Sequence, residues 1–155
     1  MKTTAALAGP RYEVLLQLLR TADTIWNASR VFFARWDLSP SQFNILNLLH
    51  AHPHGLSQSE LSRLLITHRS NVTGLVDRLE KRAWVERREV AADRRAYQVV
   101  LTRTGAALLK EILPRYYKEA QQVCGQLPPG RTLQFIADLQ GVAQNAERLT
   151  ARLPD

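Results

Sequence analysis

The chain has 155 residues, enough for one domain or for one compact unit with oligomerisation arms, and its 45% hydrophobic and 23% charged residues are typical of a soluble globular protein. It contains no apolar run of about 18 residues for a membrane span, and its first residues, MKTTAALAGP, do not resemble a signal peptide. Cys124 is the only cysteine, which excludes an intrachain disulfide and leads us to expect a cytoplasmic protein.

The charge favours an anionic partner. The formal net charge is +7 and the pI is about 10.2. Residues 57–103 hold ten Lys and Arg against six Asp and Glu, so a surplus of four positive charges falls in under a third of the chain. This balance favours a nucleic acid as the partner.

The first half of the chain predicts four helices. Apolar residues at a three-four spacing predict a long helix over 11–36 that other helices, its own or a partner's, must cover. Ser39, Pro40 and Gln42 have the order of an N-cap, first position and capping box, so a second helix starts there and ends in HAHPHG, residues 50–55. Ser57 and Glu60 form a second capping box.

A fourth helix follows, with Thr67 expected as its N-cap. Its apolar face comprises Val72, Leu75, Val76 and Leu79. The stretches WVERREV (84–90) and YQVVLT (97–102) predict an antiparallel hairpin with the longer tip AADRRA. Thr102 then caps a helix over roughly 103–125, which we expect to be interrupted at Pro114.

The turn LPPG (127–130) precedes a last helix that runs to about Leu153. In that helix Ile136, Leu139, Ala143, Ala146 and Leu149 are expected to face inward. The fold class is therefore mainly α with a small β-hairpin.

The third and fourth helices form a candidate helix-turn-helix. With its apolar side buried, the fourth helix presents Ser70, Gly74, Asp77 and Lys81, flanked by Asn71, Thr73 and Arg78. Ser70, Asn71 and Thr73 can hydrogen-bond base edges or phosphates, and Arg69, Arg78 and Lys81 suit phosphate contacts. The pattern also describes an ordinary amphipathic helix with a solvated polar face.

The hairpin favours DNA binding, because a ribbon directly after a helix-turn-helix makes a winged variant. An arginine at the tip, Arg95 or also Arg94, can enter a minor groove, and Asp93 can hold it extended by pairing with it.

The stretch 59–105, together with LSPSQFNILNLL (38–49) ahead of it, resembles the MarR family of bacterial transcriptional regulators, and the resemblance covers nearly the whole chain. The family's wing signature is matched by Asp93, Arg95, Leu101, Thr102 and Gly105, and the recognition helix by Val72, Thr73, Leu75, Val76, Arg78 and Leu79. The family often has glycine where this chain has Ala83, so the fourth helix is expected to end differently here.

The resemblance implies a winged helix-turn-helix homodimer on double-stranded DNA with a pseudo-palindromic operator. It implies helical dimerisation regions at 1–38 and 103–155 around a DNA-binding lobe at 39–102. Half-sites are expected about 10 bp apart. Repression of transcription is the implied activity.

The resemblance also implies a small aromatic acid or phenolic effector, which loosens DNA binding. Trp26, Arg30, Phe33 and Phe43 are the candidate lining, with Arg30 facing a carboxylate. The alternative is that Trp26 and Phe33 belong to the core and Arg30 to the surface.

Other features carry weaker indications. His50, His52 and His54 have the spacing of a weak zinc site, but no acid or cysteine flanks them and a polar turn is the alternative, so we expect no metal and no cofactor. Cys124 is expected to be a small buried apolar residue rather than a redox sensor. No catalytic motif is present, so we expect no enzyme.

Two functions from other classes remain open at this point. A non-specific architectural DNA-binding dimer would show no operator preference. A helical protein-interaction module would show no salt-dependent affinity for DNA at all.

Overall fold

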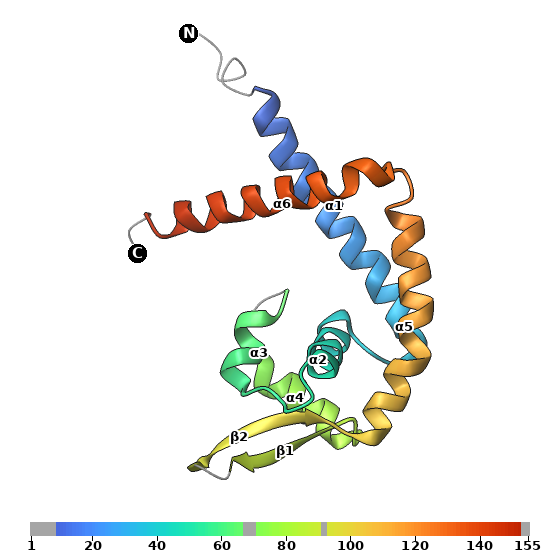
Figure 1. Cartoon of the computed structure of the whole chain (residues 1–155), viewed down its shortest axis with the longest axis vertical. Coiled ribbons are helices and arrows are strands. Elements are labelled where there is room, and N and C mark those ends of the chain that lie inside the picture. Colours follow the sequence, from blue (N-terminus) through green and yellow to red (C-terminus); the bar gives the residue numbers. More distant parts are fainter. Residues whose placement is uncertain (1–8, 67–70, 91–92, 153–155) are drawn as a thin grey trace. The chain divides into compact units, whose positions relative to one another are not determined.

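The computed structural model describes residues 9–66, 71–90 and 93–152, with the backbone alone at 90 and 93–96. It is mainly helical with one two-stranded hairpin, which confirms the predicted fold class (Figure 1). The elements are α1 (Pro10–Phe33), the short 3-10 helix η2 (Ala34–Trp36), α2 (Pro40–Ala51), α3 (Gln58–Leu64), α4 (Val72–Lys81), β1 (Val85–Val90), β2 (Asp93–Leu101), α5 (Arg103–Val123) and α6 (Pro129–Thr150). They form two compact units, Met1–Lys110 and Glu111–Asp155.

Both predicted capping boxes are confirmed. The Gln42 backbone N–H donates to the Ser39 hydroxyl at 3.2 Å, while the Ser39 N–H donates to the Gln42 side chain at 2.8 Å. Ser57 and Glu60 repeat this exchange at the start of α3. These hydrogen bonds from Ser57 lower the pKa of Glu60 below its ordinary value, so this cap is fully formed at neutral pH and weakens as the pH falls through that lowered pKa.

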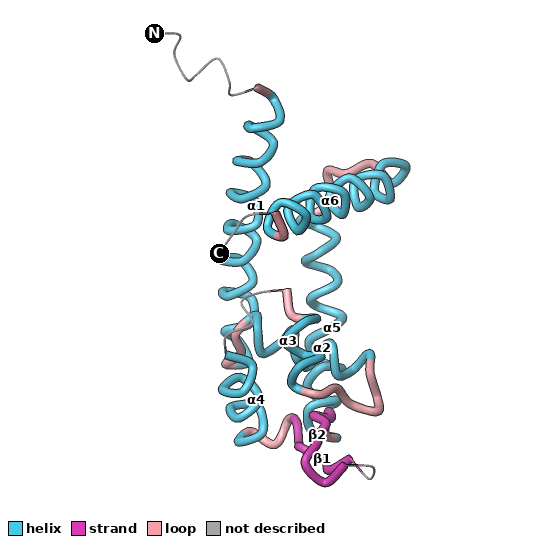
Figure 2. Tube along the Cα trace, turned by 90° about the vertical axis from the view of Figure 1, so that its left-hand side faces the viewer, coloured by secondary structure: helices cyan, strands magenta, loops and turns pink. Residues whose placement is uncertain are grey.

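The core of the first unit lies among α2, α3, α4 and the root of the hairpin. Its fully buried side chains are Phe33, Ile45, Leu46, Leu49, Leu61, Val76, Leu79, Val85, Val99 and Leu109. Leu56, just before α3, pairs with Val99 by two backbone hydrogen bonds of 3.0 and 2.8 Å. This pairing ties the start of α3 to β2, so the hairpin and the helical pair share one core. Figure 2 shows the hairpin at one end of this lobe, beyond α4.

Three predicted boundaries differ from the structure. The long N-terminal helix ends at Phe33 and continues as η2 to Trp36. The fourth helix begins at Val72 with Asn71 at the N-cap position, and the predicted cap Thr67 lies outside the described residues. Pro114 lies inside an uninterrupted α5. Leu109, Ile112 and Leu113 are buried in the turn before the proline, and such packing overrides a single unfavourable residue.

The end of α4 keeps the left-handed cap that the sequence put in doubt. Ala83 has φ +55°, its N–H donates to the Glu80 carbonyl at 2.8 Å, and the Trp84 N–H donates to the Leu79 carbonyl at 3.1 Å. These two bonds form a Schellman motif. The expectation of a different helix end was therefore wrong, since the surrounding bonds hold alanine in a conformation that favours glycine.

Ala83→Gly is expected to raise the free energy of unfolding by about 0.5–1 kcal/mol. The left-handed conformation costs alanine more than glycine, although the greater freedom of an unfolded glycine offsets part of the gain. Urea unfolding of both proteins measures the difference. Ala107→Gly, an exposed position within α5, is the control and should lose about 1 kcal/mol. If both variants lost the same free energy of unfolding, the left-handed conformation of Ala83 would carry no strain.

The apolar face of α6 is not buried within the chain. Every side chain of this fully described helix is at least partly exposed, and Ile136, Leu139 and Leu149 are 45%, 37% and 59% exposed. The expectation that these residues face inward is therefore wrong for the single chain. Helical periodicity identifies a face that needs cover, but not which chain supplies the cover.

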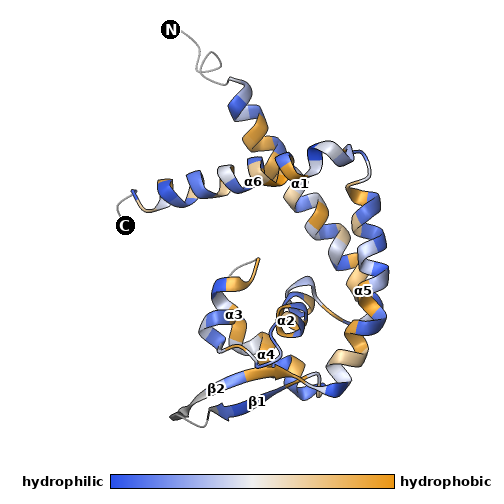
Figure 3. Ribbon diagram, in the orientation of Figure 1, coloured by the Kyte–Doolittle hydropathy of each residue, from blue (hydrophilic) through white to orange (hydrophobic). Residues whose placement is uncertain are grey.

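α1 also has an apolar face that is exposed in the single chain. Tyr12, Leu15, Leu19 and Ile25 are each 46–60% exposed. In Figure 3 orange hydrophobic stretches alternate with blue ones along both α1 and α6. None of the described helices combines the length and the apolar composition needed to cross a membrane.

Candidate nucleic-acid interface

The fourth helix presents a polar face to solvent. Val72, Val76 and Leu79 are buried and Leu75 is half-buried, whereas the exposed residues are Asn71, Thr73, Arg78 and Lys81. The Arg78 Nε donates to the Gly74 carbonyl at 3.0 Å, which holds the guanidinium along the helix. The structure thus brings four of the predicted DNA-contacting residues onto one surface. Arg69 and Ser70 lie outside the described residues.

The hairpin differs from the predicted one at its tip. β2 begins at Asp93, and the pairing passes from Glu89 opposite Tyr97 to Val90 opposite Asp93. The backbone of Asp93, Arg94 and Arg95 is therefore part of a strand with an irregular register, where a loop was predicted. Irregular pairing of this kind increases local twist. The side chains of these three residues lie outside the described part of the chain.

Arg87 fixes the root of the hairpin to α4. Its guanidinium donates to the Asp77 carboxylate at 2.5 Å and also to the Glu80 carboxylate, and its backbone N–H donates to Glu80 at 3.1 Å. The hydrogen bond with Asp77 is the main reason that the pKa of Arg87 is raised above its ordinary value. The side chain is 24% exposed, so water only partly screens the two ion pairs. The angle between α4 and the wing therefore depends on this clamp.

Arg87→Met is expected to lower the free energy of unfolding by about 1 kcal/mol, because methionine keeps much of the packing and removes both ion pairs. Urea unfolding measures the change. Arg88→Met is the matched control, because Arg88 is 63% exposed and its one ion pair among the described residues is with Glu86. The loss of stability should be below about 0.5 kcal/mol. Equal effects of the two substitutions would show that the clamp contributes no more than a surface pair.

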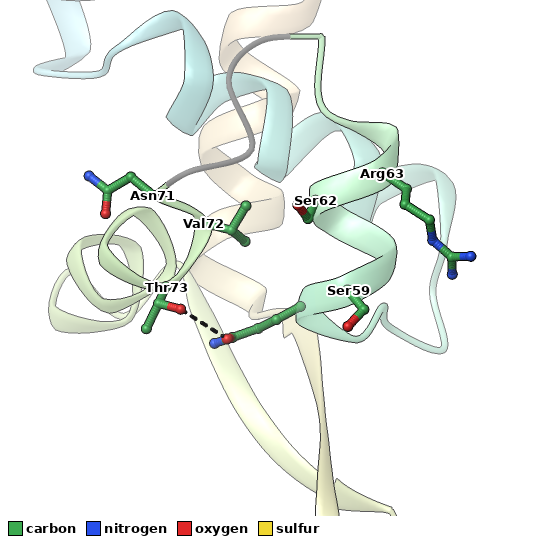
Figure 4. A pocket seen from close by; sticks show the side chains of 7 residues that line it. Ser59, Ser62, Arg63, Asn71, Val72 and Thr73 are labelled. Carbon is green, nitrogen blue, oxygen red and sulfur yellow. Dashed lines mark hydrogen bonds between the residues drawn. The ribbon is translucent and has the colours of Figure 1, made fainter. Parts of the chain in front are cut away.

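A polar pocket separates α3 from α4 (Figure 4). Its volume is about 670 Å³, and it is lined by Gln58, Ser59, Ser62 and Arg63 from α3 and by Asn71, Val72 and Thr73 from the start of α4. The Thr73 hydroxyl donates to the Gln58 Oε1 at 3.2 Å across this pocket. Serine, glutamine, asparagine and arginine side chains at a helix-turn-helix are suited to phosphate and base contacts.

Comparisons with known proteins support this geometry. Residues 36–96 match the model described as the MarR family. The transcriptional repressor YetL of Bacillus subtilis (strain 168) is 31% identical over 123 residues, which cover 79% of this chain and 74% of YetL. The chain belongs to the MarR family.

Two further comparisons add detail. The transcriptional repressor MprA of Escherichia coli (strain K12) is 39% identical over 83 residues, 54% of this chain, and the match spans about half of its own length, 47%. A structure of Bordetella bronchiseptica BpsR, whose DNA binding is regulated by 6-hydroxynicotinic acid, superposes with a TM-score of 0.72 and 26% identity over 82% of this chain and 91% of that one. YetL and MprA are both transcriptional repressors.

The residues predicted to bind an effector have different surroundings in the described part of the chain. Phe33 and Phe43 are buried and stacked, with ring centroids 4.2 Å apart, and Trp26 is half-buried. Arg30 is exposed and lines a pocket of about 340 Å³ beside the start of α2. The placement of Phe33 agrees with the core alternative, and the effector site stays a prediction.

The remaining candidates are surface residues in this MarR-family chain. His50, His52 and His54 are exposed, and the His52 Nδ1 lies 2.7 Å from the Leu48 carbonyl. In the described ranges no three His, Cys, Asp or Glu side chains are grouped as metal ligands. Cys124 is exposed in the single chain, so the expectation that it is buried was wrong for the chain alone.

The sequence analysis did not identify three residues whose side chains link separate elements around α4. They are Gln58, Arg87 and Arg82. Arg82 donates to the Asp37 carbonyl at 2.7 Å and carboxylate at 3.0 Å, and its guanidinium lies 3.7 Å from the centroid of the Trp84 ring. For Arg87 a signal existed, because the period of two along β1 places it on the same face as the buried Val85.

Proposed function

We propose that this chain is a sequence-specific DNA-binding transcriptional regulator, a repressor that acts in the cytoplasm as a homodimer. The observation that carries the proposal is the exposed polar face of α4 beside a hairpin that Arg87 clamps in place. A helix of this kind enters the major groove while the adjacent ribbon follows the DNA. Membership of the MarR family supports the same conclusion.

The proposed roles follow the position of each residue. Ser70, Asn71 and Thr73, around the start of α4, contact bases. Arg69, Arg78 and Lys81 hold phosphates. Arg95 enters the minor groove, with Asp93 as its brace and Arg94 beside it.

A homodimer is supported by the exposed apolar faces of α1 and α6. Side chains such as Leu19, Ile25, Ile136 and Leu139 need cover that neither unit supplies by itself. A two-fold dimer would place two copies of α4 on half-sites about 10 bp apart in a pseudo-palindromic operator.

The decisive experiment is a fluorescence anisotropy titration. The protein is added to a labelled duplex from its own upstream region and to a scrambled duplex, across a salt series. Preference for the upstream duplex, with affinity that falls as salt rises, supports a specific regulator. Equal binding to both duplexes indicates an architectural DNA-binding protein, and absence of binding indicates a protein-interaction module.

Arg95→Ala is expected to weaken operator binding by about 5- to 100-fold without unfolding the protein, because one minor-groove arginine is lost. The same titration measures the affinity, and circular dichroism checks the fold. Arg131→Ala, an exposed arginine of α6, is the control for the loss of one positive charge. If Arg95→Ala bound the operator with unchanged affinity, the proposed contact of Arg95 with the minor groove would be excluded.

We further propose that a small aromatic or phenolic acid releases the DNA. The regulation of BpsR by 6-hydroxynicotinic acid supports an effector of this class, and Arg30 offers a cation beside the pocket at the start of α2. Salicylate added to the titration is expected to lower the affinity for the operator, and Arg30→Gln should remove this response. A full response in Arg30→Gln would place the acid elsewhere.

A further inference from the structure

The hydrogen bond between Gln58 and Thr73 links the two helices of the helix-turn-helix at their exposed N-terminal ends. Gln58 is the first residue of α3 and Thr73 the second residue of α4. The Thr73 Oγ1 donates its proton to the Gln58 Oε1 at 3.2 Å, the dashed line in Figure 4. Fifteen residues separate them in sequence, so the bond joins α3 directly to α4 across the pocket that both residues line.

This bond decides which hydrogen-bonding groups remain for a ligand. A threonine hydroxyl has one proton, and here it is used within the protein, so towards DNA Thr73 offers only its lone pairs as an acceptor. The Gln58 carbonyl oxygen uses one of its two lone pairs in this bond, and Nε2 keeps two N–H donors. The pair therefore presents the Thr73 hydroxyl oxygen as an acceptor beside the Gln58 Nε2 amide group as a donor.

An adenine in the major groove complements that arrangement. Its N7 is an acceptor and its N6 amino group a donor, whereas guanine presents two acceptors there, cytosine one donor and thymine one acceptor with a methyl group. We propose that Gln58 and Thr73 together read an adenine, with Gln58 Nε2 donating to N7 and Thr73 Oγ1 accepting from N6. This inference rests on the proposed function, because it assigns one base of the operator.

A phosphate is a poorer ligand for the same pair. Phosphate oxygens are acceptors only, and the acceptor lone pairs of Thr73 would face them without a proton between. The pocket also offers Arg63 to a phosphate, independently of Gln58 and Thr73. In this arrangement Gln58 and Thr73 recognise the base, whereas Arg63 binds a phosphate.

The test begins with the wild-type chain and a random duplex pool, from which bound sequences are selected. Affinities are then measured for operators that differ at single positions. The variants are Gln58→Met and Thr73→Val, which keep size and remove the hydrogen bonds, their double variant, and Thr73→Ser, which keeps the hydroxyl. Gln17→Met is the matched control, since the Gln17 amide bonds the Thr21 hydroxyl at 3.1 Å on α1, outside the lobe.

The expected result concerns one adenine in each half-site. Its preference over guanine falls about tenfold or more in Gln58→Met and in Thr73→Val, because each breaks half of a paired contact. In the double variant the preference for adenine falls no further than in either single variant, as expected for coupled residues. Thr73→Ser and Gln17→Met keep the preference. Replacing that adenine by 7-deazaadenine lowers wild-type affinity but leaves Gln58→Met unaffected.

Three outcomes would overturn the inference, and one of them tests the function separately. If both variants keep every base preference within twofold, the pair does not read DNA. If Gln58→Met lowers the affinity for all DNA sequences alike, Gln58 contacts the DNA backbone instead of a base. If the wild-type chain selects no sequence, the proposed function itself fails and the inference fails with it. Circular dichroism melting of each variant ensures that folded proteins are compared.

Discussion

Gly105→Ala is expected to lower the free energy of unfolding by about 3 kcal/mol, which is opposite in sign to the usual effect of alanine within a helix. Gly105 is buried near the start of α5, where an added Cβ would overlap the Trp84 carbonyl oxygen and lie 2.9 Å from the Leu101 Cδ1. The Trp84 carbonyl cannot easily retreat, because it accepts the Thr102 N–H at 3.1 Å.

Urea unfolding measures this effect, and Gly141→Ala is the control. Gly141 lies in α6 with nothing within 4 Å of an added Cβ, so alanine there should raise stability by up to about 1 kcal/mol. If Gly105→Ala were as stable as the wild type, the backbone of α5 could not lie as close to the Trp84 carbonyl as described.

Ile136→Glu is expected to convert the proposed dimer to monomers and to weaken operator binding by about 100-fold or more. Ile136 belongs to the exposed apolar face of α6, and a carboxylate buried in a dimer interface would have no partner. A monomer also loses the gain from binding two half-sites at once. Sedimentation analysis measures the oligomeric state, and anisotropy measures the affinity.

The control for this variant is Asn145→Glu. Asn145 is exposed and lies outside the apolar stripe of α6, so the same added charge should leave the oligomeric state unchanged. A dimer that persists in Ile136→Glu at micromolar concentration would show that α6 does not form the interface.

Features that depend on neighbours in sequence were predicted well. The capping boxes at Ser39 and Ser57 involve residues three positions apart, and the Thr102 cap is confirmed by the Gly105 N–H, which donates to its hydroxyl at 3.0 Å. Such signals do not need the tertiary structure. The helix-turn-helix and the hairpin followed from them together with hydrophobic periodicity.

Features that depend on contacts between distant residues could not be predicted in this way. Pro114 continues a helix because the preceding turn is packed, and Ala83 keeps a left-handed conformation because bonds on both sides hold it. The Arg87 clamp and the bond from Gln58 to Thr73 join separate elements. The period of two along β1 indicates the face on which Arg87 lies, but no short motif indicates the partners of Arg87 or of Gln58. Within the site, exposure of the α4 residues was predictable from the helical wheel, whereas their partners were not.

The base of the hairpin is closed by bonds that do not involve its tip. The Thr102 hydroxyl donates to the Ala83 carbonyl at 2.7 Å and Thr104 donates to the same oxygen, so the residues that enter and leave the hairpin are joined directly. The entropy of closing this loop is therefore compensated at its root, and further residues add little to that cost. Residues beyond this root can therefore be replaced without loss of the folded lobe, and under the proposed function such replacements would alter which DNA sequence the protein recognises.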